Sequence, residues 1–186
     1  MSTQQNIEEF TITAFSENAI GLLNRVTIIF TRRHVNIESL TVSASAIKGI
    51  HKFTIVVNAT EDQVIKIVNQ IEKIVEVVKS YYHRRSEIIY QEVALYKVPT
   101  ESLFGDDIIE NTVRKHNARI LEVTPVYTVI EKTGHEEETD ALFRQLKEYG
   151  EVKQFTRSGR IAVTKASTEH LTEYLDLLDK YHKEKI

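Results

Sequence analysis

The same order of predicted strands and helices occurs twice along this chain of 186 residues. In the first half, apolar and polar residues alternate in three short stretches, which is typical of half-buried strands. Two longer stretches carry apolar residues at helical spacing, such as Val64, Ile67 and Val68. The predicted order is a strand at 10–14, a helix at 19–33, strands at 40–44 and 53–57, a helix at 60–74 and a strand from 75. This β-α-β-β-α-β order predicts a ferredoxin-like domain.

A second cycle of the same order follows the polar segment 83–86, which we interpret as a linker. The residues after it are β-branched and aromatic, and further stretches carry apolar residues at helical spacing. The predicted order is a strand at 87–98, a helix at 104–116, strands at 119–123 and 126–131, a helix at 137–148 and a strand at 152–156. The sequence therefore predicts an α+β fold of two ferredoxin-like domains, residues 1–82 and 87–165, with a helical tail at 166–186.

Composition argues against several classes of protein. The net charge is −3, so there is no excess positive charge for nucleic acid, and the chain contains no cysteine for disulfides or thiolate metal sites. Its seven histidines lack the spacing of metal ligands. No apolar run approaches the roughly 20 residues that span a membrane, and residues 1–9 lack the features of a signal peptide. We therefore expect a cytoplasmic protein without a bound metal, a membrane anchor or a nucleic-acid partner.

The segment 16–26 is the strongest candidate for a binding site, because it predicts a strand end, a turn and a helix start. The first amides of a helix lack acceptors within the helix and carry a partial positive charge, which attracts carboxylates. Gly21 has no side chain and would let a ligand carboxylate approach the amides of Leu22 and Leu23. The segment therefore predicts an anion-binding wall made of backbone.

Polar and aliphatic side chains flank this turn. The side-chain oxygens of Asn18 and Asn36 can accept hydrogen bonds from an ammonium group, and Ile20 and Ile37 supply an apolar wall. Such a site fits a small apolar amino acid. Other roles stay open, since Gly21 can relax the turn, Asn18 can cap the helix and Asn36 can bond its own backbone. The combination, rather than any single residue, carries the hypothesis.

A ferredoxin-like domain leaves one face of its sheet without helices and leaves two edge strands unpaired. Domains of this kind often pair side by side across a two-fold axis, which extends the sheet from one copy into the other. We therefore expect a homodimer. In it, the turn after the first strand of one copy would lie near the helix and strand of the partner.

Several stretches resemble the regulatory (small) subunits of acetolactate synthase, also called acetohydroxyacid synthase. In the first predicted domain they are Glu-Asn-Ala-Ile-Gly-Leu-Leu-Asn-Arg-Val at 17–26 and Asn-Ile-Glu-Ser-Leu-Thr-Val at 36–42. In the second they are Ala-Arg-Ile-Leu-Glu-Val-Thr-Pro at 118–125 and Thr-Arg-Ser-Gly at 156–159. The resemblance runs from about residue 8 to about residue 165.

This resemblance implies an N-terminal ACT domain, a class that senses small molecules, and a second ACT-like domain in a homodimer. It implies a non-catalytic subunit that responds to a branched-chain amino acid, usually valine, bound between two ACT domains. Asn18, Gly21 and Asn36 match the family's valine-site positions. The residues added on physical grounds are Leu22, Leu23 and Ile37, with Ile20 as an aliphatic neighbour.

The resemblance also implies a catalytic large subunit as the partner. That partner would use thiamine diphosphate, FAD and magnesium, whereas this subunit would hold no cofactor. The resulting hypothesis is a subunit that raises the activity of the large subunit and no longer activates it when valine is bound.

Three alternatives remain at this point. The chain is an ACT protein that regulates a different enzyme or regulator, or it is a structural adaptor without a ligand. The third alternative is a small hydrolase that cradles phosphate in the turn, as acylphosphatase-like domains do. That chemistry needs an arginine inside the turn, whereas Arg25 lies a helical turn further on.

Overall fold

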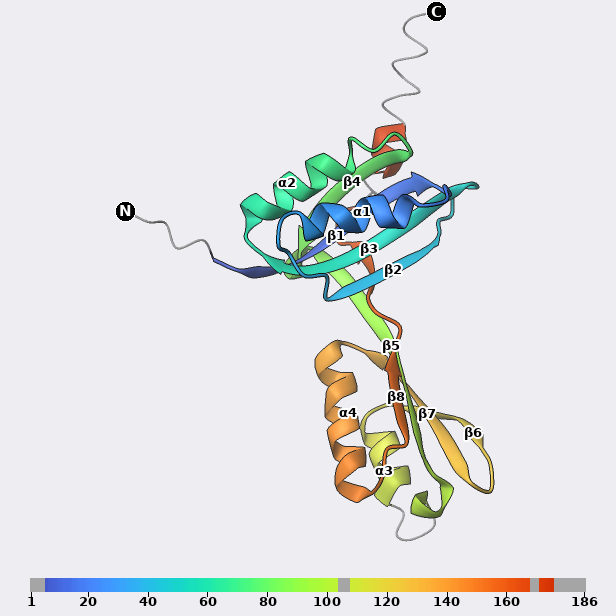
Figure 1. The fold of residues 1–186 in the computed structure, drawn as a ribbon. Coiled ribbons are helices and arrows are strands. Elements are labelled where there is room, and N and C mark those ends of the chain that lie inside the picture. The colour runs from blue at the N-terminus through green and yellow to red at the C-terminus, as the bar shows by residue number, and fades with distance from the viewer. Residues whose placement is uncertain (1–5, 104–107, 168–170, 176–186) are drawn as a thin grey trace, which may run out of the picture. The chain divides into compact units, whose positions relative to one another are not determined.

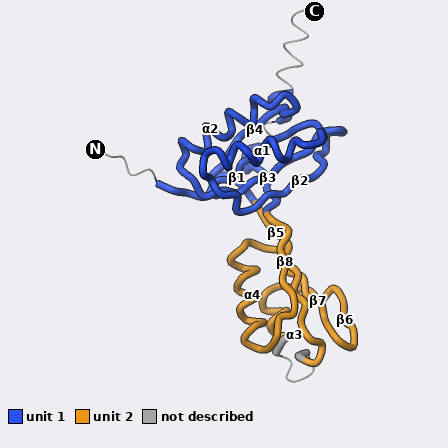
Figure 2. The backbone as a smooth tube through the Cα atoms, viewed as in Figure 1, with its two compact units in different colours: residues 1–89, 160–186 blue, residues 90–159 orange. Residues whose placement is uncertain are grey.

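The computed structural model describes residues 6–103, 108–167 and 171–175. Contacts divide the chain into two compact units, shown in different colours in Figure 2. Unit 1 contains residues 1–89 and 160–186, and unit 2 contains residues 90–159. The chain therefore passes from unit 1 to unit 2 and returns to unit 1. The segment 83–86, expected as a linker, contains the end of a strand and the start of a 3₁₀ helix, η1 (Arg85–Glu87).

Unit 1 has the predicted β-α-β-β-α-β order. Its elements are β1 (Glu8–Glu17), α1 (Leu22–Thr31), β2 (Ser39–Ala44), β3 (Ile50–Ala59), α2 (Glu61–Ile71) and β4 (Val77–Arg84). The strands pair antiparallel in the order β2-β3-β1-β4, and both helices lie on one face of this sheet (Figure 1). The prediction of a ferredoxin-like unit is confirmed, including the hairpin of β2 and β3.

The core of unit 1 lies between the sheet and its two helices. Alternate residues of β1, such as Phe10 and Ile12, point toward the helices and are almost completely buried. The predicted capping box of α2 is present, because the Thr60 hydroxyl accepts from the Gln63 amide and the Gln63 side chain accepts from the Thr60 amide. Local capping and core burial therefore agree on where α2 begins.

The face of this sheet that carries no helix is also buried. Its residues Thr11, Thr13 and Thr54 are at most 5% exposed, although their neighbours along the strands face the core. The segment that returns from unit 2 covers this face. It contains the buried Leu171 and a strand that the sequence did not predict, β9 (Ile161–Thr164), which pairs with β5 (Ile88–Pro99).

Arg160 anchors the returning segment. It is almost completely buried, and its guanidinium lies 2.9 Å from a Glu9 carboxylate oxygen and donates to the Thr11 hydroxyl at 2.9 Å. Its amide donates to the Ser39 hydroxyl at 3.2 Å, and further along the segment the Lys52 ammonium donates to the carbonyl of Ala162 at 3.1 Å. The segment is thus held on β1, β2 and β3 by polar contacts.

The tail expected at 166–186 is only partly described. Residues 171–175 are helical, and the Tyr174 ring centroid lies 5.6 Å from the Lys79 nitrogen on β4. The remainder of the expected helix, at 168–170 and from 176 onward, lies outside the described residues.

Unit 2 repeats the same topology. Its elements are β5 (Ile88–Pro99), η2 (Thr100–Leu103), α3 (Ile108–Lys115), β6 (Arg119–Val123), β7 (Tyr127–Gly134), α4 (Glu136–Tyr149) and β8 (Gln154–Arg157). The four strands follow the order β6-β7-β5-β8, which matches β2-β3-β1-β4 of unit 1 strand by strand (Figure 1). The start of the helix predicted at 104–116 falls partly on residues outside the described set.

The core of unit 2 lies between its sheet and its helices. Tyr96, Ile130, Leu142 and Leu146 are at most 2% exposed. The buried Tyr96 hydroxyl donates to the carbonyl of Thr139 at 2.7 Å. Burial raises the pKa of Tyr96, and the negative charges of the nearby Asp140 and Glu92 raise it further. The phenol is therefore held neutral and hydrogen-bonded, as a buried polar group requires.

Candidate functional site

The predicted turn lies between β1 and α1. Gly21 precedes the helix with a φ of 79° and a ψ of 0°, a left-handed conformation that favours glycine. The turn is closed by hydrogen bonds from the Ala19 amide to the Glu17 carbonyl at 3.1 Å and from the Leu22 amide to the Ala19 carbonyl at 3.2 Å. Beyond Gly21 and its two chain neighbours, no described residue has an atom within 4 Å of the position that a Cβ on Gly21 would take. The turn therefore exposes bare backbone on that side.

The first turn of α1 offers hydrogen-bond donors. The backbone amides of Leu23 and Asn24 have no acceptor within the helix, because the first bond of the helical pattern runs from the Arg25 amide to the Gly21 carbonyl. The Leu22 amide, by contrast, already bonds Ala19, and the Leu22 side chain is buried in the core. Of the two amides expected at a ligand carboxylate, that of Leu23 is the one left to donate.

Asn18 does not cap the helix. The capping position belongs to Gly21, and no side chain accepts a hydrogen bond there. Asn18 is exposed, Ile20 is fully exposed and Leu23 is about half exposed. The alternative role of Asn18 as a helix cap is thus wrong, and three of the predicted residues stand open on one turn.

An ion pair supports this turn from the loop before β4. The Arg25 guanidinium lies 2.6 Å from the Glu76 carboxylate, and the Glu17 amide donates to the Glu76 carbonyl at 2.9 Å. The hydrogen bond between the side chains raises the pKa of Arg25 and lowers the pKa of Glu76. Val75, beside this pair, is 94% exposed. Sequence pattern alone does not place Val75 and Glu76 at the site, because only the sheet topology brings this loop next to the turn.

Asn36 and Ile37 lie at the other end of the sheet. Glu17, beside the turn, pairs with Ile50, whereas Ser39, just after Asn36, pairs with Val56. Six residues of an extended strand separate these positions on β3, or about 20 Å. A single small ligand therefore cannot touch both halves of the predicted site within one copy of unit 1.

Asn36 is exposed, and its side-chain Nδ2 donates to the Glu38 carboxylate at 3.3 Å rather than to its own backbone. Ile37 is partly buried and packs against the core of unit 1. The two residues thus form a surface next to the edge strand β2. This is the edge at which a second copy could extend the sheet.

The described residues were also compared with the requirements of a metal site and of a membrane-spanning helix. They contain no group of three or more His, Asp or Glu placed to hold a metal ion. None of their helices is both long and apolar enough to cross a bilayer. His135 caps the start of α4, where the Glu138 carboxylate accepts from the His135 backbone amide at 2.7 Å.

Comparison with known proteins agrees with this geometry. Several classes of protein share the ferredoxin-like topology of these two units, and a family model of the first unit identifies this one as an ACT protein. A family model described as an "AHAS small subunit-like ACT domain" matches residues 12–79, and one described as "Small subunit of acetolactate synthase" matches residues 91–166. The chain belongs to the family of acetolactate synthase small subunits, which are regulatory rather than catalytic.

Individual relatives support this assignment. The acetolactate synthase small subunit of Mycolicibacterium smegmatis is 32% identical over 155 residues, which cover 83% of this chain and 90% of the relative. The small subunit of Bacillus subtilis is 31% identical over 159 residues, covering 85% and 91%. A crystal structure of the small subunit from Thermotoga maritima superposes with a TM-score of 0.76 at 28% identity, covering 87% of this chain and all of that one.

Proposed function

We propose that this chain is the feedback subunit of acetolactate synthase and that it binds a branched-chain amino acid, with valine as the first candidate. It acts in the cytoplasm by binding the catalytic large subunit and raising its activity, and binding of the amino acid to this chain removes the activation. The large subunit brings the thiamine diphosphate, FAD and magnesium, and this chain brings none. Family membership and the turn at Gly21 support the proposal.

The single observation that carries the ligand site is the bare backbone at Gly21. A ligand carboxylate would accept from the amides of Leu23 and Asn24, where the positive end of the helix dipole adds attraction. The exposed side chain of Asn18 would accept from the ammonium group, and the exposed Ile20 would contact the aliphatic side chain.

A homodimer completes this site. Because about 20 Å separates the turn from Asn36 within one chain, both can serve one ligand only when they come from different copies. Antiparallel pairing of the β2 edges reverses the second sheet and carries Asn36 of one copy toward the turn of the other. Each homodimer would then hold two equivalent sites.

Titration calorimetry with valine, leucine and isoleucine tests the binding step. The wild-type chain should release or absorb heat with at least one of them, with an affinity in the micromolar to millimolar range. This range follows from burial of one aliphatic side chain, about 1.5–3 kcal/mol, and a few charge-assisted hydrogen bonds, before the cost of association. No heat with any of the three would contradict the site.

Gly21→Asp and Gly21→Asn form a matched pair for the same assay. Both residue types tolerate a left-handed backbone and have nearly the same volume. Only aspartate places a negative charge beside the proposed carboxylate position. Binding should therefore fall much further in Gly21→Asp than in Gly21→Asn, and equal losses would show that shape, rather than charge, disturbs the turn.

The partner is tested separately by co-purification with the catalytic large subunit and by assay of the complex with and without valine. Activation by the wild-type chain that valine reverses supports the proposal. A chain that binds valine but neither captures nor activates the large subunit would instead be an ACT protein that regulates a different enzyme.

A further inference from the structure

Unit 2 contains a cavity of about 310 Å³ whose lining comes from the end of α3, from β7 and from the start of α4. Of the seven lining residues that the structure describes, six are polar or charged, and Ala141 is the seventh. The volume is in the range of small-molecule sites, but a lining of this kind does not suit an apolar ligand such as valine. The cavity therefore calls for a ligand of different chemistry from that at the turn of unit 1.

Lys132 is the buried charge at this cavity. It lies on β7 two residues after the core residue Ile130, so its side chain points to the same helix-covered side of the sheet. That side chain is 8% exposed and lines the cavity. An ammonium group has three hydrogen-bond donors, and its burial is costly unless acceptors lie close to the nitrogen.

The residues that the structure describes do not supply those acceptors. Lys132 donates no hydrogen bond to any of them, and the carboxylate oxygen that comes nearest, Glu138 Oε1, lies 3.9 Å from its nitrogen. The other carboxylate oxygen of Glu138 already accepts from the His135 amide at 2.7 Å. The ammonium of Lys132 is thus balanced in charge by Glu138 at a distance, but its donors are left for a ligand in the cavity.

Gly134 makes room for this arrangement at the end of β7. A Cβ at this position would lie 2.7 Å from Glu138 Oε2 and 3.3 Å from the Cε of Lys132. Because both distances are shorter than ordinary contacts, a larger residue would push the two side chains aside. The glycine therefore keeps the ammonium of Lys132 at the cavity.

Further donors reach the cavity from the end of α3. Lys115 and Asn117 are exposed, and His116 is half-buried. His116 Nε2 lies 2.6 Å from Gln145 Oε1, and the Gln145 amide group donates to the Tyr149 hydroxyl at 3.1 Å. These contacts with α4 hold the imidazole in place, so the cavity has one fixed ring beside two exposed donors.

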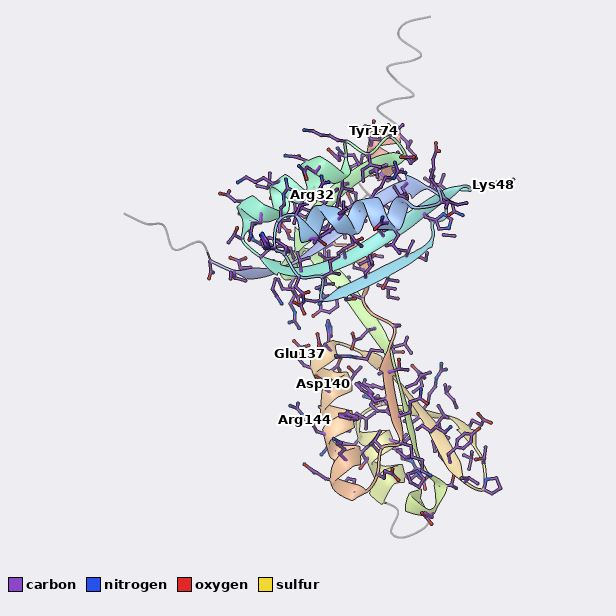
Figure 3. All side chains as sticks on the ribbon, in the orientation of Figure 1. Arg32, Lys48, Glu137, Asp140, Arg144 and Tyr174 are labelled. Atoms are coloured by element: carbon purple, nitrogen blue, oxygen red, sulfur yellow. The ribbon has the colours of Figure 1, made fainter. Side chains whose placement is uncertain are left out.

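We propose that this cavity binds a small organic anion through a phosphate or carboxylate group. The anionic oxygens accept from the Lys132 ammonium, and Lys115 adds a second positive charge. Glu138 and Glu137, which lies in the first turn of α4 (Figure 3), also line the cavity. Their carboxylates favour a ligand whose other end carries hydroxyl or amino donors rather than a second negative charge.

Amide NMR titration of the full-length protein tests the proposal with inorganic phosphate and, separately, with acetate. Sodium chloride at the same ionic strength is the reference. At least one of the two anions should shift the amide signals of Asn117 and Gly134 in a saturable way, with a dissociation constant on the order of a millimolar. The anion that does so identifies the head group. The absence of a saturable shift with both anions would overturn the proposal.

Lys132→Met and Lys147→Met form a matched pair for this titration. Each variant removes one positive charge from unit 2, and Lys147 is exposed on α4 and does not line the cavity. Lys132→Met should weaken anion binding about tenfold or more, because it removes a charge-assisted donor. Lys147→Met should weaken it by less than about twofold. Equal weakening in both variants would mean that overall charge holds the anion, and the proposed site would be wrong.

Stability in urea separates a binding role of Lys132 from a structural one. Methionine is similar in length and needs no hydrogen bonds, so Lys132→Met should leave the urea midpoint of the β7 amides in hydrogen exchange unchanged or raise it. A lowered midpoint with unchanged anion binding would show that Lys132 serves only as the partner of Glu138, against the proposal. Valine plays no part in these measurements, so their failure leaves the proposed function untouched.

Discussion

Unit 1 and unit 2 have the same strand order, but among the described residues both faces of the sheet are buried in unit 1 alone. In unit 1 the returning segment lies over Thr11 and brings the buried Arg160 against Glu9. In unit 2 the equivalent face is partly exposed and holds a shallow cavity beside Val129. The same topology therefore exposes different surfaces in the two units, because the returning segment of the chain covers the helix-free face in unit 1.

The difference also separates the roles of the two sheets. Because residues 160–164 cover the helix-free face of unit 1, the described surfaces that remain exposed include the edge strand β2 and the turn before α1. Those are the surfaces that the proposed ligand site uses. In unit 2 no described segment covers the broad helix-free face, and a broad face suits docking of another protein surface better than capture of a small molecule.

The largest predicted effect comes from removing the anchor of the returning segment. Arg160→Met leaves Glu9 without its buried partner, which should lower the free energy of unfolding of unit 1 by about 3 kcal/mol. Hydrogen exchange of the β1 and β3 amides in increasing urea measures this loss. Arg114→Met is the control, because Arg114 pairs with Glu110 on the surface of α3 and its loss should cost about 0.5 kcal/mol or less. Equal losses in both variants would show that Arg160 is no anchor.

The second prediction concerns the ligand. At about one hundred times the dissociation constant, valine should protect the amides of unit 1 by about 2.7 kcal/mol. Unit 2 should gain no direct protection, because the proposed site lies wholly in two copies of unit 1. Hydrogen exchange with and without valine gives both values from one sample, and stronger protection in unit 2 would place the site there instead.

The third prediction separates backbone strain from binding within unit 1. Gly21→Ala and Gly49→Ala both place a Cβ at a left-handed position, with φ of 79° and 84°, and no described residue beyond the chain neighbours lies within 4 Å of either Cβ. Each should destabilise unit 1 by about 1 kcal/mol in urea. Only Gly21→Ala should also weaken valine binding in calorimetry. Loss of binding in both variants would mean that strain alone accounts for the effect.

The smallest predicted effect is a pH dependence in unit 2. The hydrogen bond from Thr133, together with that from Arg119, lowers the pKa of Glu131. Its contribution is therefore present above the unfolded carboxyl pKa of about 4.3 and is lost as the pH falls through the lower folded value. Glu131→Gln should weaken the loss of unit 2 stability at acid pH. Hydrogen exchange of the β7 amides between pH 5 and about 2.5 measures this dependence. An unchanged dependence would contradict this role.

Most of the fold could be predicted because its signals are local. The alternation in β2 and β3 and the capping box at Thr60 lie within a few residues of sequence, and the structure has both. The strand β9 could not be predicted from local pattern. It pairs with β5, some seventy residues earlier, and Arg160 finds Glu9 only after the chain has passed through unit 2 and returned.

The candidate site was predicted in part. The left-handed Gly21 and the open Asn18 lie where the turn pattern indicated, because turn chemistry is read from adjacent residues. The distance between that turn and Asn36 follows from strand register, which local patterns do not fix. The support from Glu76 is likewise a product of topology, since β4 begins beside the end of β1.

Mixing two defective variants tests most directly whether the site is built by two copies. Gly21→Asp and Asn36→Ala should each fail to bind valine alone. In a mixed dimer, one site combines the intact turn of one copy with the intact Asn36 of the other. Unfolding and refolding an equal mixture should therefore restore about a quarter of the wild-type binding capacity in calorimetry, as random pairing of copies requires. A mixture that binds no valine, although both variants dimerise, would contradict a site shared between copies.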